Sequence, residues 1–228
     1  RKLEVAADLG IDNSLGRRVW KPKQSKRAEA SRKRTKKTET LRVKSQVRLG
    51  LHRTGTSAAQ GYANKANGVA PSARMSQRRD AARVATKLRP HMSLTCWFAA
   101  QDPDPLCPSD PLLALPLAQV TEWLGAYFAD GALRDLVRRS WTKSWPKMVQ
   151  RPAWTRWHWA RGPTSSVQAL LCELQWEAPS SDRWITPAGT TLEFDEEVMA
   201  EQQGRPVDLR PVRAALVETI GKGLYEEA

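Results

Sequence analysis

The chain has few of the residues that build metal centres and disulfide frameworks. Its 228 residues include three Cys and three His. Cys96, Cys107 and Cys172 lie far apart and form no CxxC pair, and the histidines are scattered. This pattern argues against a disulfide framework and against a zinc site, and it is typical of a reducing compartment. We expect no metal and no other cofactor in this chain.

Long apolar runs are missing as well. The longest candidate, residues 112–128, is interrupted by Pro116, Gln119 and Glu122. It therefore falls short of the ~18 apolar residues that a membrane span requires. The sequence begins at Arg1, without Met and without the apolar region of a signal peptide. We expect a fragment of a longer reading frame, intracellular (nuclear or cytoplasmic), with no membrane partner.

A third absence is that of a catalytic constellation. No serine lies in a G-x-S-x-G turn, and residues 221–223 lack the flanking residues of a phosphate-binding loop. Asp130 follows Tyr127, as an aspartate does in the metal-binding turn of polymerases, but Gly131 replaces the second carboxylate. Since one carboxylate is a poor site for a divalent ion, we interpret residues 127–131 as a helix end with a glycine cap. The sequence predicts no catalytic residue.

What the chain does have is a sharp break in charge. Residues 1–89 hold 24 Lys and Arg against 6 Asp and Glu, whereas residues 90–228 hold 13 against 18. The net charges of +18 and −5 add up to the +13 of the whole chain. Residues 17–53 alone carry 15 basic and 2 acidic residues. A run this long repels itself and favours a polyanionic partner. A solvated helix, or a nuclear-localisation signal at residues 32–37, is the alternative.

The basic segment is also poor in apolar side chains. Apart from Pro22, residues 21–40 contain only Ala28 and Ala30 as apolar residues. Such a stretch buries too little surface to offset an ordering entropy of about 1–2 kcal/mol per residue. We expect it to be disordered, or a frayed helix, until a partner orders it. A second basic helix is expected from Pro71 to about residue 88. The candidate nucleic-acid-binding residues are Arg17, Arg18, Lys21, Lys23, Lys26, Arg27, Arg32, Lys33, Arg34, Lys36, Lys37, Arg74, Arg78, Arg79 and Arg83.

The rest of the chain carries the pattern of a folded core. Nine of the ten Trp lie there, and apolar residues recur at helical spacing in residues 117–128, 167–174 and 212–224. Residues 184–194, with a Pro-Ala-Gly turn, predict a β-hairpin. We predict a mainly α fold, in which a basic, partly disordered N-terminal helical segment precedes a Trp-rich helical domain with one small β-hairpin. The expected divisions are a basic nucleic-acid-contacting segment (1–53), a loop (54–70), a basic helix and apolar segment (71–100), a Pro-rich loop (101–111) and the Trp-rich domain (112–228).

Five of the tryptophans lie in residues 141–159, with basic residues between them. Aromatic and basic side chains together are typical of sites where nucleic-acid bases stack. They are equally typical of a core in which arginine stems cover the rings. We favour the core, because Trp154 and Trp157 are three residues apart and would share one helical face.

Several short motifs occur in an order that resembles one protein family. Before and after the basic run, the motifs are Leu9-Gly10-Ile11-Asp12, Gly16-Arg17-Arg18-Val19, His52-Arg53-Thr54-Gly55, Gly61-Tyr62 and Gly68-Val69-Ala70-Pro71-Ser72. Later motifs are Ala153-Trp154-Thr155-Arg156, Trp159, Arg161-Gly162-Pro163, Leu174-Gln175-Trp176-Glu177-Ala178-Pro179-Ser180, Trp184 and Gly189. Taken in order, the chain resembles the region after the palm in the reverse transcriptases of non-LTR (LINE-like) retrotransposons of the protist type. Gln175 stands where the family usually has Gly.

The resemblance implies a function for the basic run. It would be the thumb- or connection-like part of an RNA-directed DNA polymerase, and its partners would be an RNA or DNA duplex and the upstream polymerase domain of the same polyprotein. The catalytic aspartates and their Mg²⁺ would belong to that upstream domain, so this chain would be a non-catalytic portion. The alternative is a degenerate retroelement remnant, or an interaction module whose basic run is a nuclear-localisation tag.

Overall fold

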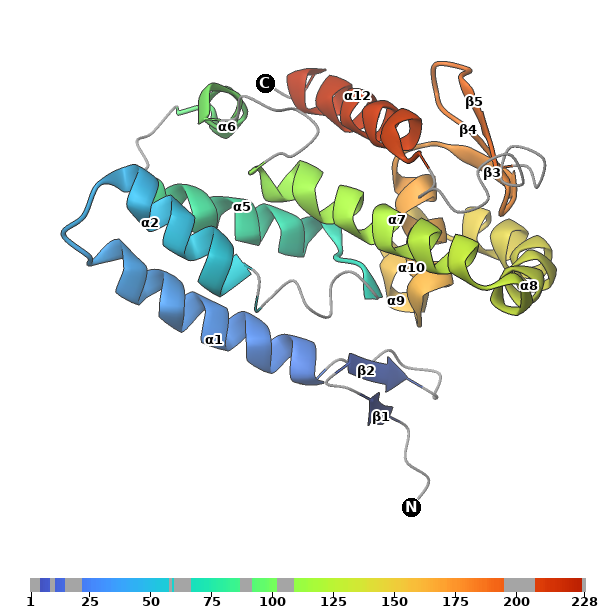
Figure 1. Cartoon of the computed structure of the whole chain (residues 1–228), viewed down its shortest axis with the longest axis horizontal. Helices are drawn as coiled ribbons and strands as arrows, with labels where there is room; N and C mark the ends of the chain where they lie inside the picture. The colour runs from blue at the N-terminus through green and yellow to red at the C-terminus, as the bar shows by residue number, and fades with distance from the viewer. Residues whose placement is uncertain are drawn as a thin grey trace.

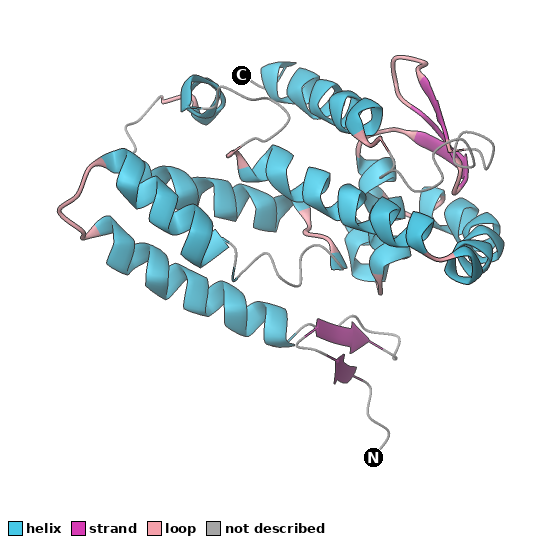
Figure 2. Ribbon diagram, viewed as in Figure 1, coloured by secondary structure: helices cyan, strands magenta, loops and turns pink. Residues whose placement is uncertain are grey.

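The computed structural model describes residues 5–8, 11–14, 22–57, 59, 67–86, 92–101, 109–194 and 208–226. This part of the chain is mainly α, as predicted (Figure 2). The elements are β1 (Val5–Asp8), β2 (Ile11–Ser14), α1 (Pro22–Glu39), α2 (Ser45–Leu51), the π-helical turn η1 (His52–Ser57), α5 (Pro71–Ala85), α6 (Leu94–Gln101), α7 (Pro111–Ala129), α8 (Gly131–Val149), α9 (Ala153–Trp159), α10 (Pro163–Glu173), β3 (Glu177–Ser180), β4 (Arg183–Ile185), β5 (Thr191–Glu193) and α12 (Arg210–Glu226).

The basic segment forms a layer of helices at one edge of the molecule. Helices α1 and α2 lie side by side and contact α5, and α1 also contacts η1 (Figure 1). Ahead of them, β1 and β2 pair as an antiparallel hairpin with Val5 opposite Ser14. The sequence predicts that this segment is disordered, or a frayed helix, until a partner orders it. In the structure α1 is one continuous helix, and the elements that it contacts, among them α5 and η1, belong to the same chain.

The core lies in the other half, where α7, α8, α10 and α12 enclose a cluster of aromatic rings. The Trp123 ring lies 5.6 Å from Trp141 and 5.8 Å from Trp184, centroid to centroid. Buried indoles need partners, and Trp141 Nε1 donates to the carbonyl of Ala178 at 2.9 Å. The helical stripes predicted in α7 and α10 supply the aliphatic part of this cluster.

The predicted hairpin is confirmed as β4 and β5, which pair with Trp184 opposite Leu192. Gly189 adopts φ +82 in the connecting turn, a conformation that glycine takes at little cost. A third strand, β3, extends the sheet in the order β3-β4-β5 and was not predicted. The sheet covers the aromatic cluster, because Ala178, Trp184 and Leu192 all point into it.

Two aspartates set helix starts. Helix α7 begins at Pro111, six residues before the predicted apolar stripe of residues 117–128, because the Asp110 carboxylate accepts a hydrogen bond from Leu112 N and caps the helix there. Residues 127–131 are structural, as predicted, but the cap is not glycine. Asp130 caps the start of α8 by accepting from the backbone N–H groups of residues 132 and 133.

The turn after α10 has the backbone that a glycine would take. Gln175 has φ 58, and the Trp176 N–H donates to the Leu171 carbonyl at 2.9 Å, while the Gln175 N–H donates to Cys172 at 3.3 Å. These two bonds form the Schellman motif, whose left-handed position is most often Gly. The turn therefore forms here with a residue that is strained in this conformation.

Candidate nucleic-acid interface

Helix α1 divides into an inward stripe and an outward face. Ser31 and Thr35 are buried, while Arg27, Ala28 and Glu39 are half-buried. These positions recur at steps of three and four residues, so they form one stripe, and this stripe is the side that meets α5 and η1. The stripe contains no large apolar side chain. The helix is therefore attached by small polar residues and leaves its remaining circumference to solvent.

The outward face of α1 is strongly basic. The helix holds eight basic and two acidic residues, a net charge of +6. The exposed basic residues are Lys26, Arg32, Lys33, Arg34, Lys36 and Lys37. Glu29 is the acidic residue on this face, and its carboxylate lies 2.9 Å from Lys33 Nζ. The hydrogen bond and charge of Lys33 lower the pKa of Glu29. One exposed pair of this kind leaves most of the positive charge unneutralised.

The spacing of these charges suits a long polyanion. Lys26 and Lys37 are eleven residues apart, which spans about 16 Å of helix at 1.5 Å per residue. A nucleic-acid duplex carries about one negative charge per 1.7 Å of its axis, so this length faces on the order of ten phosphates. The helix therefore carries several exposed cations along a length equal to about ten phosphate spacings of a duplex.

Helix α5 adds two arginines beside α1. Arg79 and Arg83 are exposed, and Arg83 Nη1 lies 3.8 Å from Asp80 at the next turn. Burial raises the pKa of Asp80, against the lowering effect of Arg83 and of Arg32 on α1. Asp80 thus sits between the basic surfaces of the two helices. We call the six exposed basic residues of α1, together with Arg79 and Arg83, the α1 basic surface.

The expectation that Arg74 and Arg78 lie on the surface is wrong. Both side chains are about 4 % exposed. Arg74 hydrogen-bonds Glu173 and lies 5.8 Å above the ring of Trp157. Both arginines are used inside the protein, and neither faces a phosphate.

The Arg78 guanidinium lies 2.8 Å from Asp110 and donates to Thr95 at 3.0 Å. Together with Arg74 it shares a buried stripe with Ala81, Ala82 and Ala85. Positions 74, 78, 81 and 85 are four, three and four residues apart, which places them on one face of the helix. This spacing was a signal in the sequence that the two arginines share the face of the alanines and point inward.

Four of the predicted binding residues are not placed by the structure. Arg17, Arg18 and Lys21 lie outside the described residues, and Lys23 lies in α1 without a described side chain. The predicted phosphate-contacting role of these four stays a prediction. Of the described candidates, Arg27 belongs to the half-buried inward stripe rather than to the α1 basic surface.

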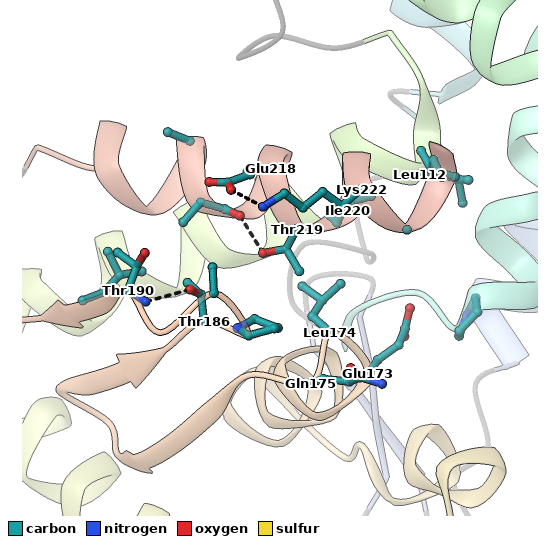
Figure 3. Close-up of a pocket in the computed structure, with 18 of the residues that line it drawn as sticks. Leu112, Glu173, Leu174, Gln175, Thr186, Thr190, Glu218, Thr219, Ile220 and Lys222 are labelled. Carbon is teal, nitrogen blue, oxygen red and sulfur yellow. Dashed lines mark hydrogen bonds and ion pairs between the residues drawn. The ribbon is translucent and has the colours of Figure 1, made fainter. Parts of the chain in front are cut away.

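A cleft of about 830 Å³ lies between α12, the end of α10 and the β4–β5 turn (Figure 3). Three of its polar residues, Glu173, Glu218 and Thr219, already have hydrogen-bond or ion-pair partners within the chain. Glu173 accepts from Trp157 Nε1 at 2.9 Å as well as from Arg74, and Glu218 is 2.6 Å from Lys222. Thr219 donates to a backbone carbonyl at 2.8 Å.

No nucleophile with a base beside it faces this cleft among the described residues. Two further groups with shifted pKa values, Tyr127 and Cys172, are buried. Burial and the hydrogen bond to Asp182 raise the pKa of Tyr127 to about 12, so this hydroxyl stays protonated. Burial likewise raises the pKa of the Cys172 thiol to about 11.

The aromatic segment is divided between core and surface. Trp141 is fully buried and Trp145 and Trp157 are partly buried against the core, which confirms the core interpretation for these three. Trp154 is 79 % exposed and completes no core, so the shared helical face expected for Trp154 and Trp157 was wrong. Helix α9 is seven residues long, and none of its residues is fully buried.

No family model matches the chain, and no curated protein or solved structure is significantly similar to it. In the ranges that the structure describes, no three His, Cys, Asp or Glu side chains gather as they would around a metal ion. Across those same ranges, no helix has both the length and the apolar character to cross a membrane.

Proposed function

We propose that this chain binds the phosphate backbone of a nucleic-acid duplex through the α1 basic surface. The observation that carries the proposal is the outward face of α1, where six exposed Lys and Arg side chains are accompanied by one acidic residue. Phosphate contacts fix position without reading base sequence. We therefore expect binding that depends little on sequence and strongly on salt.

The resemblance noted in the sequence extends this proposal. In a reverse transcriptase, the region after the palm grips the primer–template duplex, and we propose that this chain is such a non-catalytic portion, acting with an upstream polymerase domain. The lack of a catalytic pair in the described cleft is consistent with a gripping role. Sequencing the transcript upstream of Arg1 tests the extension, since an in-frame palm with its aspartate pair supports it and a nearby start codon contradicts it.

Charge-matched variants test the duplex contact directly. The triple variant Lys33→Gln, Lys36→Gln, Lys37→Gln removes three charges from the α1 basic surface. The control variant Arg183→Gln, Arg210→Gln, Lys222→Gln removes three exposed charges elsewhere. Each lost phosphate contact reduces the slope of log K against log salt by about 0.9. We expect a reduction of about 2 to 3 for the first variant and little change for the control, and equal slopes would contradict the proposal.

The nuclear-localisation alternative makes a different prediction for the same surface. Replacing Arg32, Lys33, Arg34, Lys36 and Lys37 by Ala removes a run whose five side chains are all exposed. Loss of nuclear entry with unchanged duplex affinity would favour a localisation tag. Loss of duplex affinity supports the gripping role.

A further inference from the structure

A second basic surface lies on α8. Arg139, Lys143 and Lys147 are exposed and follow one another at steps of four residues, on the side of α8 opposite the buried Trp141 and Met148. Steps of four place them in one row along the helix, about 6 Å apart at 1.5 Å per residue. Within the described ranges, none of these three forms an ion pair. The row is therefore a line of unneutralised charge.

Two exposed tryptophans lie on α9, the helix that follows α8 along the chain. Trp154 is 79 % exposed, and Trp159 is 38 % exposed. The Arg151 guanidinium lies 3.4 Å from the centroid of the Trp159 ring, and that of Arg161 lies at 5.4 Å. Trp159 is thus already stacked with cations, while Trp154 offers its ring to solvent.

Helix α9 is held firmly against the end of α8. The Arg156 guanidinium donates to the carbonyls of Val149 at 3.3 Å and Arg151 at 3.1 Å, and also to that of Cys172 in α10 at 3.2 Å. These bonds link α9 to the last residue of α8, to the connection between the two helices and to α10. Trp154 is consequently mounted on a fixed element, and its exposure does not depend on a loop.

We propose that the α8–α9 surface binds single-stranded nucleic acid, with Trp154 stacking on a base and the α8 row contacting phosphates. A lone exposed tryptophan would need no explanation. Here the ring belongs to the helix that follows the exposed cations of α8 along the chain, and a single strand is the polyanion that also offers unstacked base faces. A duplex keeps its base faces covered by its own stacking, so it fits this surface less well.

This surface is separate from the α1 basic surface. Figure 1 shows α8 at the end of the molecule away from the α1–α2 connection. The two surfaces involve different side chains and different ligands. Either proposal can fail while the other holds.

Binding of a fluorescently labelled oligothymidylate tests the stacking contact. Loss of one base–aromatic stack weakens binding about 5- to 150-fold. We expect Trp154→Ala to show this loss and Trp154→Phe, which keeps a ring, to retain most of the affinity. Leu136→Ala is the control, because Leu136 is 63 % exposed on α8 and offers no ring to stack. Duplex affinity should be unchanged in all three variants.

Charge variants test the phosphate contacts of the same surface. Lys143→Gln with Lys147→Gln should reduce the salt slope for the oligothymidylate by about 1.4, at 0.7 per contact. The fluorescence difference between wild type and Trp154→Ala reports on Trp154 among the ten tryptophans, and inorganic polyphosphate should compete with the oligothymidylate without changing that difference. An oligothymidylate affinity that is the same in Trp154→Ala and wild type would overturn the proposal. So would an equal loss of duplex binding in Trp154→Ala.

Discussion

The buried pair of Arg78 and Asp110 gives the sharpest test of how the basic layer is fixed to the core. The two side chains are each 5 % exposed, and they join α5 to the start of α7, with Thr95 of α6 as a third partner. Asp110→Asn removes the charge of the carboxylate. It keeps an oxygen that can accept from Leu112 N, so the helix cap survives. The variant therefore removes the charge of the pair and keeps the helix cap.

The expected cost follows from the burial of the pair. Removing one partner leaves the other charge without compensation inside the protein, which costs about 3–5 kcal/mol of unfolding free energy. In a chain of this size, each kcal/mol lowers the melting temperature by about 2–4 °C, so we expect a decrease of roughly 6–20 °C. The control is Glu193→Gln, which breaks the Arg183–Glu193 pair at 3.3 Å, where both side chains are more than half exposed. That change should cost no more than about 1 kcal/mol.

Urea unfolding at neutral pH measures Asp110→Asn and the control Glu193→Gln, together with the single variant Arg78→Met and the double variant Arg78→Met with Asp110→Asn. Since the double variant leaves no unpaired charge in the interior, its loss of stability should be smaller than the sum of the two single losses. A cost for Asp110→Asn that matches the cost for Glu193→Gln would refute the reasoning. It would mean that Arg78 finds other compensation and that the pair does not hold the layers together.

Three further changes have expected signs. Gly68→Ala should lower the free energy of unfolding by more than about 1–2 kcal/mol in thermal unfolding, because Gly68 has φ +64 and a Cβ there would lie 2.7 Å from the Trp157 ring. The control is Gly125→Ala, because Gly125 has open space around it. Gln175→Gly should raise the unfolding free energy by up to about 1 kcal/mol, because it relieves the left-handed backbone at φ 58, and a decrease would contradict this. Burial lowers the pKa of His52 below 6.5, so the folded state favours the neutral ring. The contribution of His52 to stability should be retained above pH 6.5 and lost as the pH falls through the folded pKa. In urea titrations, His52→Leu should flatten this part of the dependence of unfolding free energy on pH.

Much of the core was predictable because its signals are local. The stripe in α10 is a run of apolar residues at helical spacing, and Val167, Leu170 and Leu171 are fully buried. The β4–β5 hairpin carries its turn residues in sequence. Strand β3 escaped prediction because Glu177-Ala178-Pro179-Ser180 contains a proline and no β-branched residue. It is an edge strand of the sheet, where a proline is tolerated.

The candidate site was only partly predictable, since its outcome depends on distant partners. Arg74 and Arg79 look alike in the sequence, but Arg74 faces Glu173, which lies 99 residues further along the chain. Likewise Trp141 and Trp154 belong to one aromatic-rich segment, yet α8 carries the first into the core and the short α9 leaves the second at the surface. Which side of α1 faces solvent also depended on the position of α5 and η1.

The salt dependence of duplex binding tests the central claim most directly. The measurement is the affinity of the full chain for a labelled duplex of arbitrary sequence, in a series from low to physiological salt. If six or more phosphates are neutralised by the α1 basic surface and its neighbours, affinity should fall about 10³-fold or more between 50 and 200 mM salt, with little difference between duplex sequences. A shallow salt slope, or no binding at low salt, would contradict the account.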